Sequence, residues 1–246
     1  MQQLRGSLNL PNTPPWRNSL SYRSLLAVFF GGLSIGVLGS LGAELLFAVT
    51  LGDLQSPKVI IVAMAGQYLS LPVMLFWLYR SLPRGELFAK LGLCKLKKGD
   101  WRAILTGIVL IILSNEILTS AWKMLLDYFG VVYYEQQNIL ALLSQADFFT
   151  VLGMGICTII GAPIIEEIFF RRLLYELLLP LGTIRAILLG SFLFAVIHFF
   201  LLGIPALFFM GLVFQIIFLL RGNLACAMIA HAVANLLAFA GTLLVA

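Results

Sequence analysis

Long apolar stretches separated by short polar segments dominate the chain. Seven of them are long enough to cross the roughly 30 Å hydrocarbon core of a bilayer as helices. They are Leu25–Leu51, Val59–Tyr79, Ala103–Leu126, Phe148 to about Leu179, Ile184–Phe200, Ile204–Leu220 and Leu224–Val245. Helices and closed barrels alone satisfy every backbone polar group in lipid. The pattern therefore predicts an all-α, polytopic transmembrane helical bundle of about seven spans, with a range of six to eight.

The same pattern divides the chain into three parts. Residues 1–24 are polar and contain prolines, which is typical of a solvent-exposed arm. Residues 25–147 hold the N-terminal transmembrane helices and a basic loop, and residues 148–246 hold a helical core that carries most of the candidate chemistry. The first span is too long for the apolar region of a signal peptide, so we expect it to remain as an anchor.

Composition excludes several classes of protein. The 246 residues are 61% hydrophobic and only 11% charged, whereas a soluble domain carries about 25% charged residues. This balance excludes a cytosolic enzyme, a disordered protein and a nucleic-acid binder, despite a net charge of +5. Cys94, Cys157 and Cys226 lack paired spacing, so we expect small apolar residues rather than a disulfide framework or a zinc knuckle.

The basic residues predict the orientation in the membrane. With the N-terminus in the cytoplasm, 14 of the 16 Lys and Arg residues fall on the cytoplasmic side. The loop Asp127–Asp147 has no Lys or Arg and falls outside. This asymmetry follows the positive-inside rule. The basic loop Arg80–Arg102 fits an interfacial amphipathic helix and a solvated loop equally well.

Charges inside apolar spans are costly and therefore point to function. Glu167 and Arg171 are spaced i,i+4 with the acid first, the favourable order for an ion pair on a helix. Glu166 lies about 100° further round the helix, so it points elsewhere and is available for general acid–base chemistry. Arg172 and Glu176 form a second i,i+4 pair, which we expect to be solvated near the headgroups.

The two histidines of the chain both lie in apolar runs. Phe194 precedes His198 by one helical turn and provides an apolar wall beside its ring. His231 and Asn235 are also one turn apart, and an imidazole with an amide can jointly donate to a developing oxyanion. The alternative is a charge cluster at a helix end, with the histidines as hydrogen-bonding contacts between helices.

Together the patterns Glu166-Glu167-x-x-x-Arg171, Phe194-x-x-x-His198 and His231-x-x-x-Asn235 resemble the CPBP family of intramembrane proteases. This family includes the type II CAAX prenyl endopeptidases, the bacteriocin-processing proteins and the Abi proteins. The resemblance covers roughly Val151–Leu244.

The resemblance implies an endopeptidase that cuts a membrane-associated peptide or a lipidated protein, from a site facing the cytoplasmic leaflet. Glu166 would activate a water with the help of His198, and His231 and Asn235 would stabilise the oxyanion. Glu167 and Arg171 would be a supporting pair that orients Glu166.

Two questions stay open at this level. A zinc-protease His-Glu-x-x-His helix is absent, yet Glu166, His198 and His231 are acceptable ligands for a divalent metal such as zinc. In straight spans His198 would also lie about twice as deep as His231. The helices must therefore tilt, break or re-enter, and Gly182, Gly203 and Pro205 offer places for this.

Two other functions compete with proteolysis. A non-enzymatic membrane partner, such as an immunity factor or a chaperone-like scaffold, would retain the fold, but such a member is expected to have lost a catalytic position. An ion-coupled transporter also uses buried Glu and His; it would show paired inverted repeats, and none is detectable. Glu44 and Glu116 have no evident partner, and we interpret them as polar contacts within the bundle or near span ends.

Overall fold

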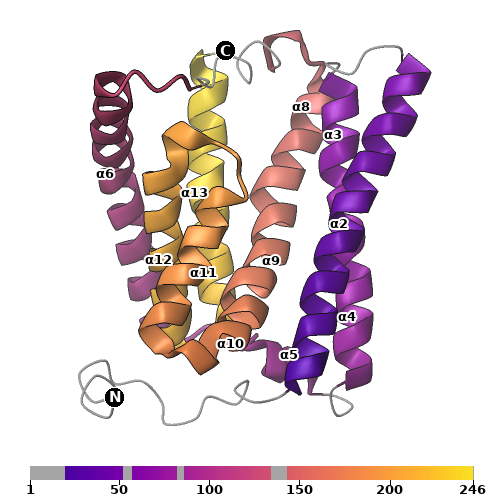
Figure 1. Cartoon of the computed structure of the whole chain (residues 1–246), viewed down its shortest axis with the longest axis vertical. Coiled ribbons are helices and arrows are strands. Elements are labelled where there is room, and N and C mark those ends of the chain that lie inside the picture. Colours follow the sequence, from indigo (N-terminus) through magenta and orange to yellow (C-terminus); the bar gives the residue numbers. More distant parts are fainter. Residues whose placement is uncertain (1–19, 52–56, 82–85, 134–142, 246) are drawn as a thin grey trace. The chain divides into compact units, whose positions relative to one another are not determined.

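The computed structural model describes residues 20–51, 57–81, 86–133 and 143–245, and these contain helices and turns but no strand. Figure 1 shows the helices and their labels. The prediction of an all-α, polytopic helical bundle is confirmed. The predicted arm of residues 1–24 lies almost wholly outside the described residues.

Six helical segments of the described chain are long and apolar enough to cross a membrane. They are Tyr22–Thr50, Pro57–Arg80, Lys98–Tyr128, Phe148–Leu181, Leu201–Arg221 and Leu224–Val245. The remaining predicted span, Ile184–Phe200, is wrong in its extent. Its helix α11 covers only Thr183–Val196, or about 21 Å at 1.5 Å per residue, so it is shorter than the hydrocarbon core.

Backbone contacts divide the chain into two compact units. The first unit contains the site motifs between Glu166 and His231. Its elements are α5 (Leu87–Leu91), α6 (Lys98–Tyr128), the π-helix η3 (Glu167–Leu174), α10 (Tyr175–Leu178), η4 (Leu179–Leu181), α11, η5 (Leu201–Gly203), α12 (Ile204–Arg221) and α13 (Leu224–Val245) as far as residue 234.

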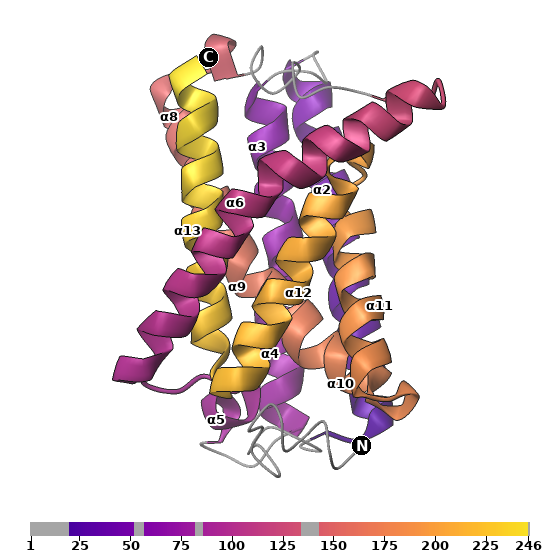
Figure 2. The same cartoon turned by 90° about the vertical axis from the view of Figure 1, so that its left-hand side faces the viewer.

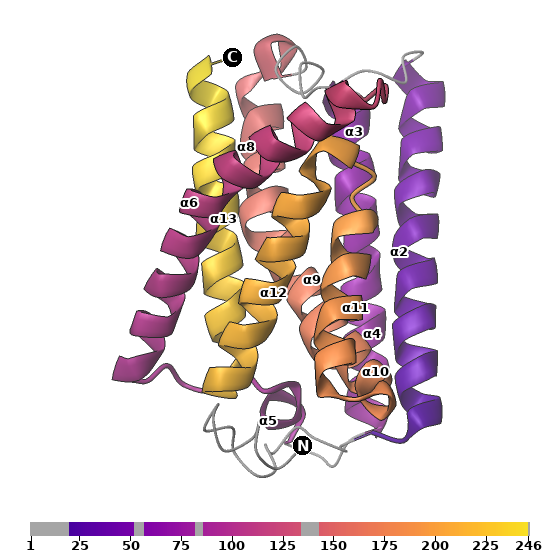
Figure 3. The ribbon, with the colours of Figure 1, turned by 60° about the vertical axis from the view of Figure 1, so that its left-hand side comes forward.

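Small residues let the helices of the first unit approach closely. Helices α11 and α12 run side by side (Figure 3), and a Cβ on Gly211 would lie only 3.0 Å from the Cβ of Ser191. Helix α6 crosses α12 (Figure 2), where Gly107 leaves room for Ile217. Close helix contact through small residues is the usual solution in membranes.

The second unit is built on its own set of helices. Its elements are α2 (Tyr22–Leu51), α3 (Pro57–Gly66), η1 (Gln67–Leu69), α4 (Ser70–Ser81), α8 (Phe148–Ile156), the π-helix η2 (Cys157–Gly161), α9 (Ala162–Glu166) up to residue 165, and α13 from Asn235. Helices α2 and α3 lie side by side (Figure 1). They pack through Gly39 and Gly66, where a Cβ on either residue would collide with the backbone of the other.

A tight turn at Gly182 sets the relative level of two site residues. Its φ of 101° and ψ of 150° are accessible essentially only to glycine. Glu166 and His198 each lie 16 residues from this glycine along the chain. Because the helical segments on either side run back along each other, both residues lie at a similar level. The chain thus breaks its helical path at Gly182 and again at Gly203, where the short η5 precedes α12, as expected.

The basic loop combines one short helix with an irregular, largely exposed stretch. Helix α5 has only five residues and ends at Gly92, whose φ is 77°. The side-chain amide of Asn223 then pairs with the backbone of Cys94: its Oδ1 accepts from the Cys94 N–H at 3.2 Å, and its Nδ2 donates to the Cys94 carbonyl oxygen at 3.1 Å. Arg221 Nε donates to Asp100 Oδ1 at 2.7 Å. Residues 86–100 are thus tied to the turn between α12 and α13, while residues 82–85 lie outside the described residues.

Candidate functional site

The two adjacent glutamates lie where the helix changes its winding. Helix α9 ends at Glu166, and the π-helix η3 begins at Glu167. π-helical turns inside α-helices are frequent at functional sites. Arg171 Nε donates to Glu167 Oε2 at 3.0 Å, and both side chains are fully buried. The ion pair predicted from the i,i+4 spacing is therefore confirmed.

Glu167 also holds one of the histidines. Its Oε1 accepts a hydrogen bond from His231 Nδ1 at 2.9 Å, and Phe214 stacks on the imidazole with ring centroids 4.7 Å apart and an interplanar angle of 19°. His231 is thus fixed both in its ring plane and across its face. The pair of Glu167 and Arg171 therefore contacts His231, rather than Glu166 as we expected.

Phe194 joins these groups from α11. It is fully buried, and its ring meets the rings of His198 and His231 edge-on at 4.8 and 5.9 Å. The guanidinium carbon of Arg171 lies 4.4 Å from the centre of the same ring, a cation–π contact. Phe194 is the predicted apolar wall of His198, and it also supports His231 and Arg171.

His198 lies in a turn rather than in a span. Helix α11 ends at Val196, two residues before it. Its Nδ1 lies 2.6 Å from the carbonyl oxygen of Phe194. Because His198 lies outside the helix, its ring can point back along α11. The prediction that His198 is helical is therefore wrong. The predicted contact with Phe194, four residues earlier, is confirmed.

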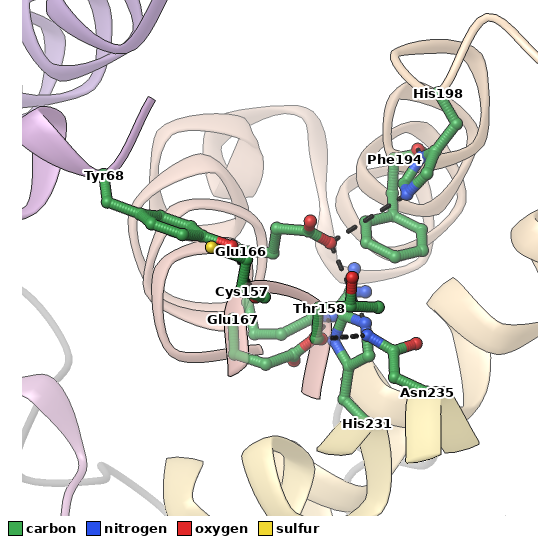
Figure 4. Close-up of polar contacts among 10 residues, drawn as sticks. Tyr68, Cys157, Thr158, Glu166, Glu167, Phe194, His198, His231 and Asn235 are labelled. Carbon is green, nitrogen blue, oxygen red and sulfur yellow. Dashed lines mark hydrogen bonds and ion pairs between the residues drawn. The ribbon is translucent and has the colours of Figure 1, made fainter. Parts of the chain in front are cut away.

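Glu166 faces both histidines (Figure 4). Its Oε2 lies 4.0 Å from His198 Nε2 and 3.8 Å from His231 Nε2. This oxygen is buried and has no hydrogen-bond partner among the described residues. The separations exceed a direct hydrogen bond of about 2.7–3.2 Å, so the three atoms surround a point that a small polar molecule can bridge.

The hydrogen bonds on the far side of each ring determine which nitrogen carries the proton. A carbonyl and an ionised carboxylate only accept, so His198 Nδ1 donates to Phe194 and His231 Nδ1 donates to Glu167. In the neutral rings both Nε2 atoms then carry lone pairs. Three acceptor atoms therefore converge, an arrangement that suits a water which donates to two of them.

The same three atoms are the donor types that a divalent metal prefers, with each imidazole oriented by an outer hydrogen bond. Among the described residues, however, no group of three or more His, Cys, Asp or Glu side chains is placed so that it could hold a metal ion. We therefore derive no chemistry through a metal.

The second ion pair of this helix differs from its prediction. Arg172 and Glu176 bind each other, but both side chains are almost fully buried rather than solvated. Arg172 Nε also donates to the carbonyl oxygen of Lys90 at 2.8 Å. The pair thus connects η3 to α5 inside the first unit.

Asn235 belongs to the second unit, four residues beyond His231 on the continuous helix α13. Its Nδ2 donates to the carbonyl oxygen of Thr158 at 2.8 Å, and the hydroxyl of Tyr68 donates to the carbonyl oxygen of Cys157. Both carbonyls belong to the π-helix η2, where the change of winding disturbs backbone pairing. An amide nitrogen carries two hydrogens, so this contact uses one of them.

Sequence reasoning missed Phe214 and Tyr68. Each is an aromatic residue in an apolar span with no charged or polar partner at helical spacing. The sequence also did not indicate the close approach at Gly161, where a Cβ would lie 2.6 Å from the Tyr68 ring. Such contacts between distant segments leave no periodic signal in a single sequence.

Part of the chain is similar to a known protein family. Residues 148–237 match the family model described as "Type II CAAX prenyl endopeptidase Rce1-like". No curated protein and no solved structure matches the chain. The family match confirms the resemblance predicted from the three motifs. The six candidate spans and the similarity of residues 148–237 to this family of membrane proteases support an integral, multi-pass membrane protein.

Proposed function

On the premise that residues 148–237 form an Rce1-like segment, we propose that the protein is an intramembrane endopeptidase. It hydrolyses a peptide bond of a membrane-associated or lipidated substrate. One observation carries this proposal: the unpartnered Oε2 of Glu166 lies 4.0 and 3.8 Å from the Nε2 atoms of His198 and His231, separations that one water can bridge.

Glu166 is the general base in this proposal. A water between Glu166 and His198 donates one hydrogen to each, since the carboxylate and the Nε2 lone pair both accept. Transfer of a proton to Glu166 lets the water oxygen attack the scissile carbonyl carbon. The same proton then passes to the amine that leaves, so the carboxylate is regenerated as the peptide bond breaks.

His231 and Asn235 stabilise the tetrahedral oxyanion. His231 Nδ1 is occupied by Glu167, so its Nε2 donates only when the ring carries both protons; Glu167 then provides the counter-charge. Asn235 follows one turn later on the same helix and has a second amide hydrogen to offer. Such preoriented donors lower the barrier most where charge develops.

The orientation is part of the proposal. The distribution of Lys and Arg supports a cytoplasmic N-terminus, and we propose that the N-terminus lies there and that the site opens towards the cytoplasmic leaflet. A half-buried carboxylate and two histidines that lie among apolar helices suit a peptide that is itself held in or near the membrane.

The experiment is a comparison of protein termini in membranes from cells that express either the wild-type chain or Glu166→Gln. We expect Glu166→Gln, His198→Ala and His231→Ala each to abolish cleavage in a folded, inserted protein. Glu116→Gln removes another carboxylate from a candidate span of the first unit and serves as the matched control. Full cleavage by folded Glu166→Gln would overturn the proposal, and rescue of a cellular phenotype without cleavage would favour a non-enzymatic scaffold.

A further inference from the structure

The turn that follows His198 contains a backbone outlier. Phe199 has a φ of 49° and is the sole non-glycine residue with positive φ among the described residues. This left-handed region disfavours bulky side chains, whereas glycine enters it without a steric penalty. A phenylalanine at this position therefore needs a reason other than backbone geometry.

Burial does not supply that reason. The Phe199 side chain is 92% exposed, more than any other large apolar side chain in the part of the chain that the structure describes. Its neighbours Val196, Ile197, His198 and Leu201 are also exposed but less so, and fully buried side chains return only at Ala195 and Leu202. The ring of Phe199 therefore contributes almost nothing to the core of the first unit.

The turn is nevertheless anchored on both sides. The backbone N–H of Phe199 donates to Val196 at 3.0 Å, and His198 Nδ1 donates to Phe194. After the turn, Trp122 Nε1 on α6 donates to the carbonyl oxygen of Leu201 at 2.9 Å. The strained conformation is thus held by contacts around it, as is typical of strain at active sites.

Proximity to the reacting groups suggests what the ring contacts. The Cα atoms of adjacent residues are about 3.8 Å apart, and His198 Nε2 lies 4.0 Å from Glu166 Oε2. A peptide positioned for attack between Glu166 and His198 lies within reach of a phenylalanine ring on the next residue. We propose that Phe199 determines specificity by contacting an apolar group of the substrate beside the scissile bond; this rests on the proposed function.

Contact with lipid alone explains the observation less well. A lipid-facing position accepts any apolar residue with an ordinary backbone, and the other exposed large apolar residues of the described chain have negative φ. Within the described ranges, Phe199 alone combines nearly complete exposure with left-handed backbone at a non-glycine residue. That combination is expected where an exposed ring must be held at a defined point.

The test uses the full-length protein in proteoliposomes and two internally quenched peptides, identical except that one cysteine carries an S-hexadecyl or an S-methyl group. Phe199→Asn removes the ring but tolerates positive φ, and Phe199→Leu keeps apolar bulk. Phe192→Asn removes a half-exposed ring from α11 and is the matched control. We expect Phe199→Asn to lower kcat/KM about tenfold for the S-hexadecyl peptide and less than about twofold for the S-methyl peptide.

We expect Phe199→Leu to stay within about threefold of wild type with both peptides, and Phe192→Asn within about twofold. Equal losses for both peptides with Phe199→Asn would overturn the proposal, as would no loss for either. A binding measurement separates this result from the proposed function. In a Glu166→Gln background, Phe199→Asn should weaken binding of a fluorescent S-hexadecyl peptide about tenfold.

If the wild-type chain cleaves neither peptide but this binding difference is present, the proposed function fails, and the part of the inference that stands is that Phe199 contacts the apolar group of a bound peptide. Unchanged binding in the Glu166→Gln background would overturn the inference.

Discussion

His231 Nδ1 donates to Glu167 Oε1 across 2.9 Å, although 64 residues separate them along the chain. The same carboxylate binds Arg171 through its other oxygen. One buried acid therefore neutralises a buried cation and orients a histidine. The two tasks can be separated by mutation, because only the histidine belongs to the proposed chemistry.

Removing the acid alone should be costly. Glu167→Leu leaves the Arg171 charge buried and unpaired, which we expect to lower the free energy of unfolding by about 3–5 kcal/mol. In the double variant Glu167→Leu/Arg171→Met, most of that stability should return because an apolar pair replaces the ions. Cleavage should stay lost, since His231 lacks its orienting acceptor. Unfolding in detergent and peptide cleavage measure the two effects; a double variant with wild-type activity would contradict the role of Glu167.

Stacking on Phe214 should affect catalysis more than stability. Phe214→Leu removes the face-to-face contact with His231, an interaction of about 0.5–1.5 kcal/mol beyond the buried area. We expect kcat to fall several-fold with KM nearly unchanged. Ile217→Val on the same helix lies against Gly107 and should cost about 0.5–1.5 kcal/mol. If this control lowers kcat equally, stability rather than ring placement explains the loss.

Tyr68 and Asn235 both satisfy carbonyls of the π-helix η2, so they form a natural comparison. Tyr68→Phe and Asn235→Ala each leave a part-buried acceptor without its donor, and each should lower stability by about 1 kcal/mol. Asn235→Ala should in addition lower kcat far more than Tyr68→Phe, because only Asn235 is proposed to bind the oxyanion. Tyr79→Phe, at an exposed tyrosine, is the control. Equal kcat for the two variants would argue that Asn235 has only a structural role.

Acidification should weaken the start of α8. Asp147 caps this helix by accepting from the backbone N–H of Thr150 at 2.8 Å. This hydrogen bond, helped by Lys58, holds the pKa of Asp147 below its ordinary value of 3.8. A depressed pKa contributes stability that is complete above the ordinary value and is lost as the pH falls through the lowered one. Asp147→Asn still caps the helix but does not titrate, so its melting temperature should fall less than that of wild type below about pH 4.

The orientation can be tested with the cysteines of the chain. Cys94 is exposed, whereas Cys157 and Cys226 are buried. Because the basic segment around Cys94 is predicted to be cytoplasmic, a membrane-impermeant maleimide should label the protein in inside-out vesicles and not in intact cells. Cys94→Ser should abolish labelling in both. Labelling of Cys94 in intact cells would reverse the predicted topology.

Features that depend on local spacing and composition could be predicted from the amino-acid sequence alone. Apolar length predicted the spans, the i,i+4 rule predicted the ion pair of Glu167 and Arg171, and the three motifs predicted the family. These succeed because helix geometry and the cost of charge in lipid act on neighbouring residues.

The remaining features depend on contacts between segments that are far apart in the sequence, so they could be seen only in the tertiary structure. Helix α11 ends before His198, and Arg172 and Glu176 are buried rather than solvated. The carboxylate of Glu167 accepts from His231 rather than orienting Glu166. In addition, π-helical turns lie before and after Glu166. In each case a partner far along the chain changed the balance between alternatives of similar local energy, and no local pattern encodes such a partner.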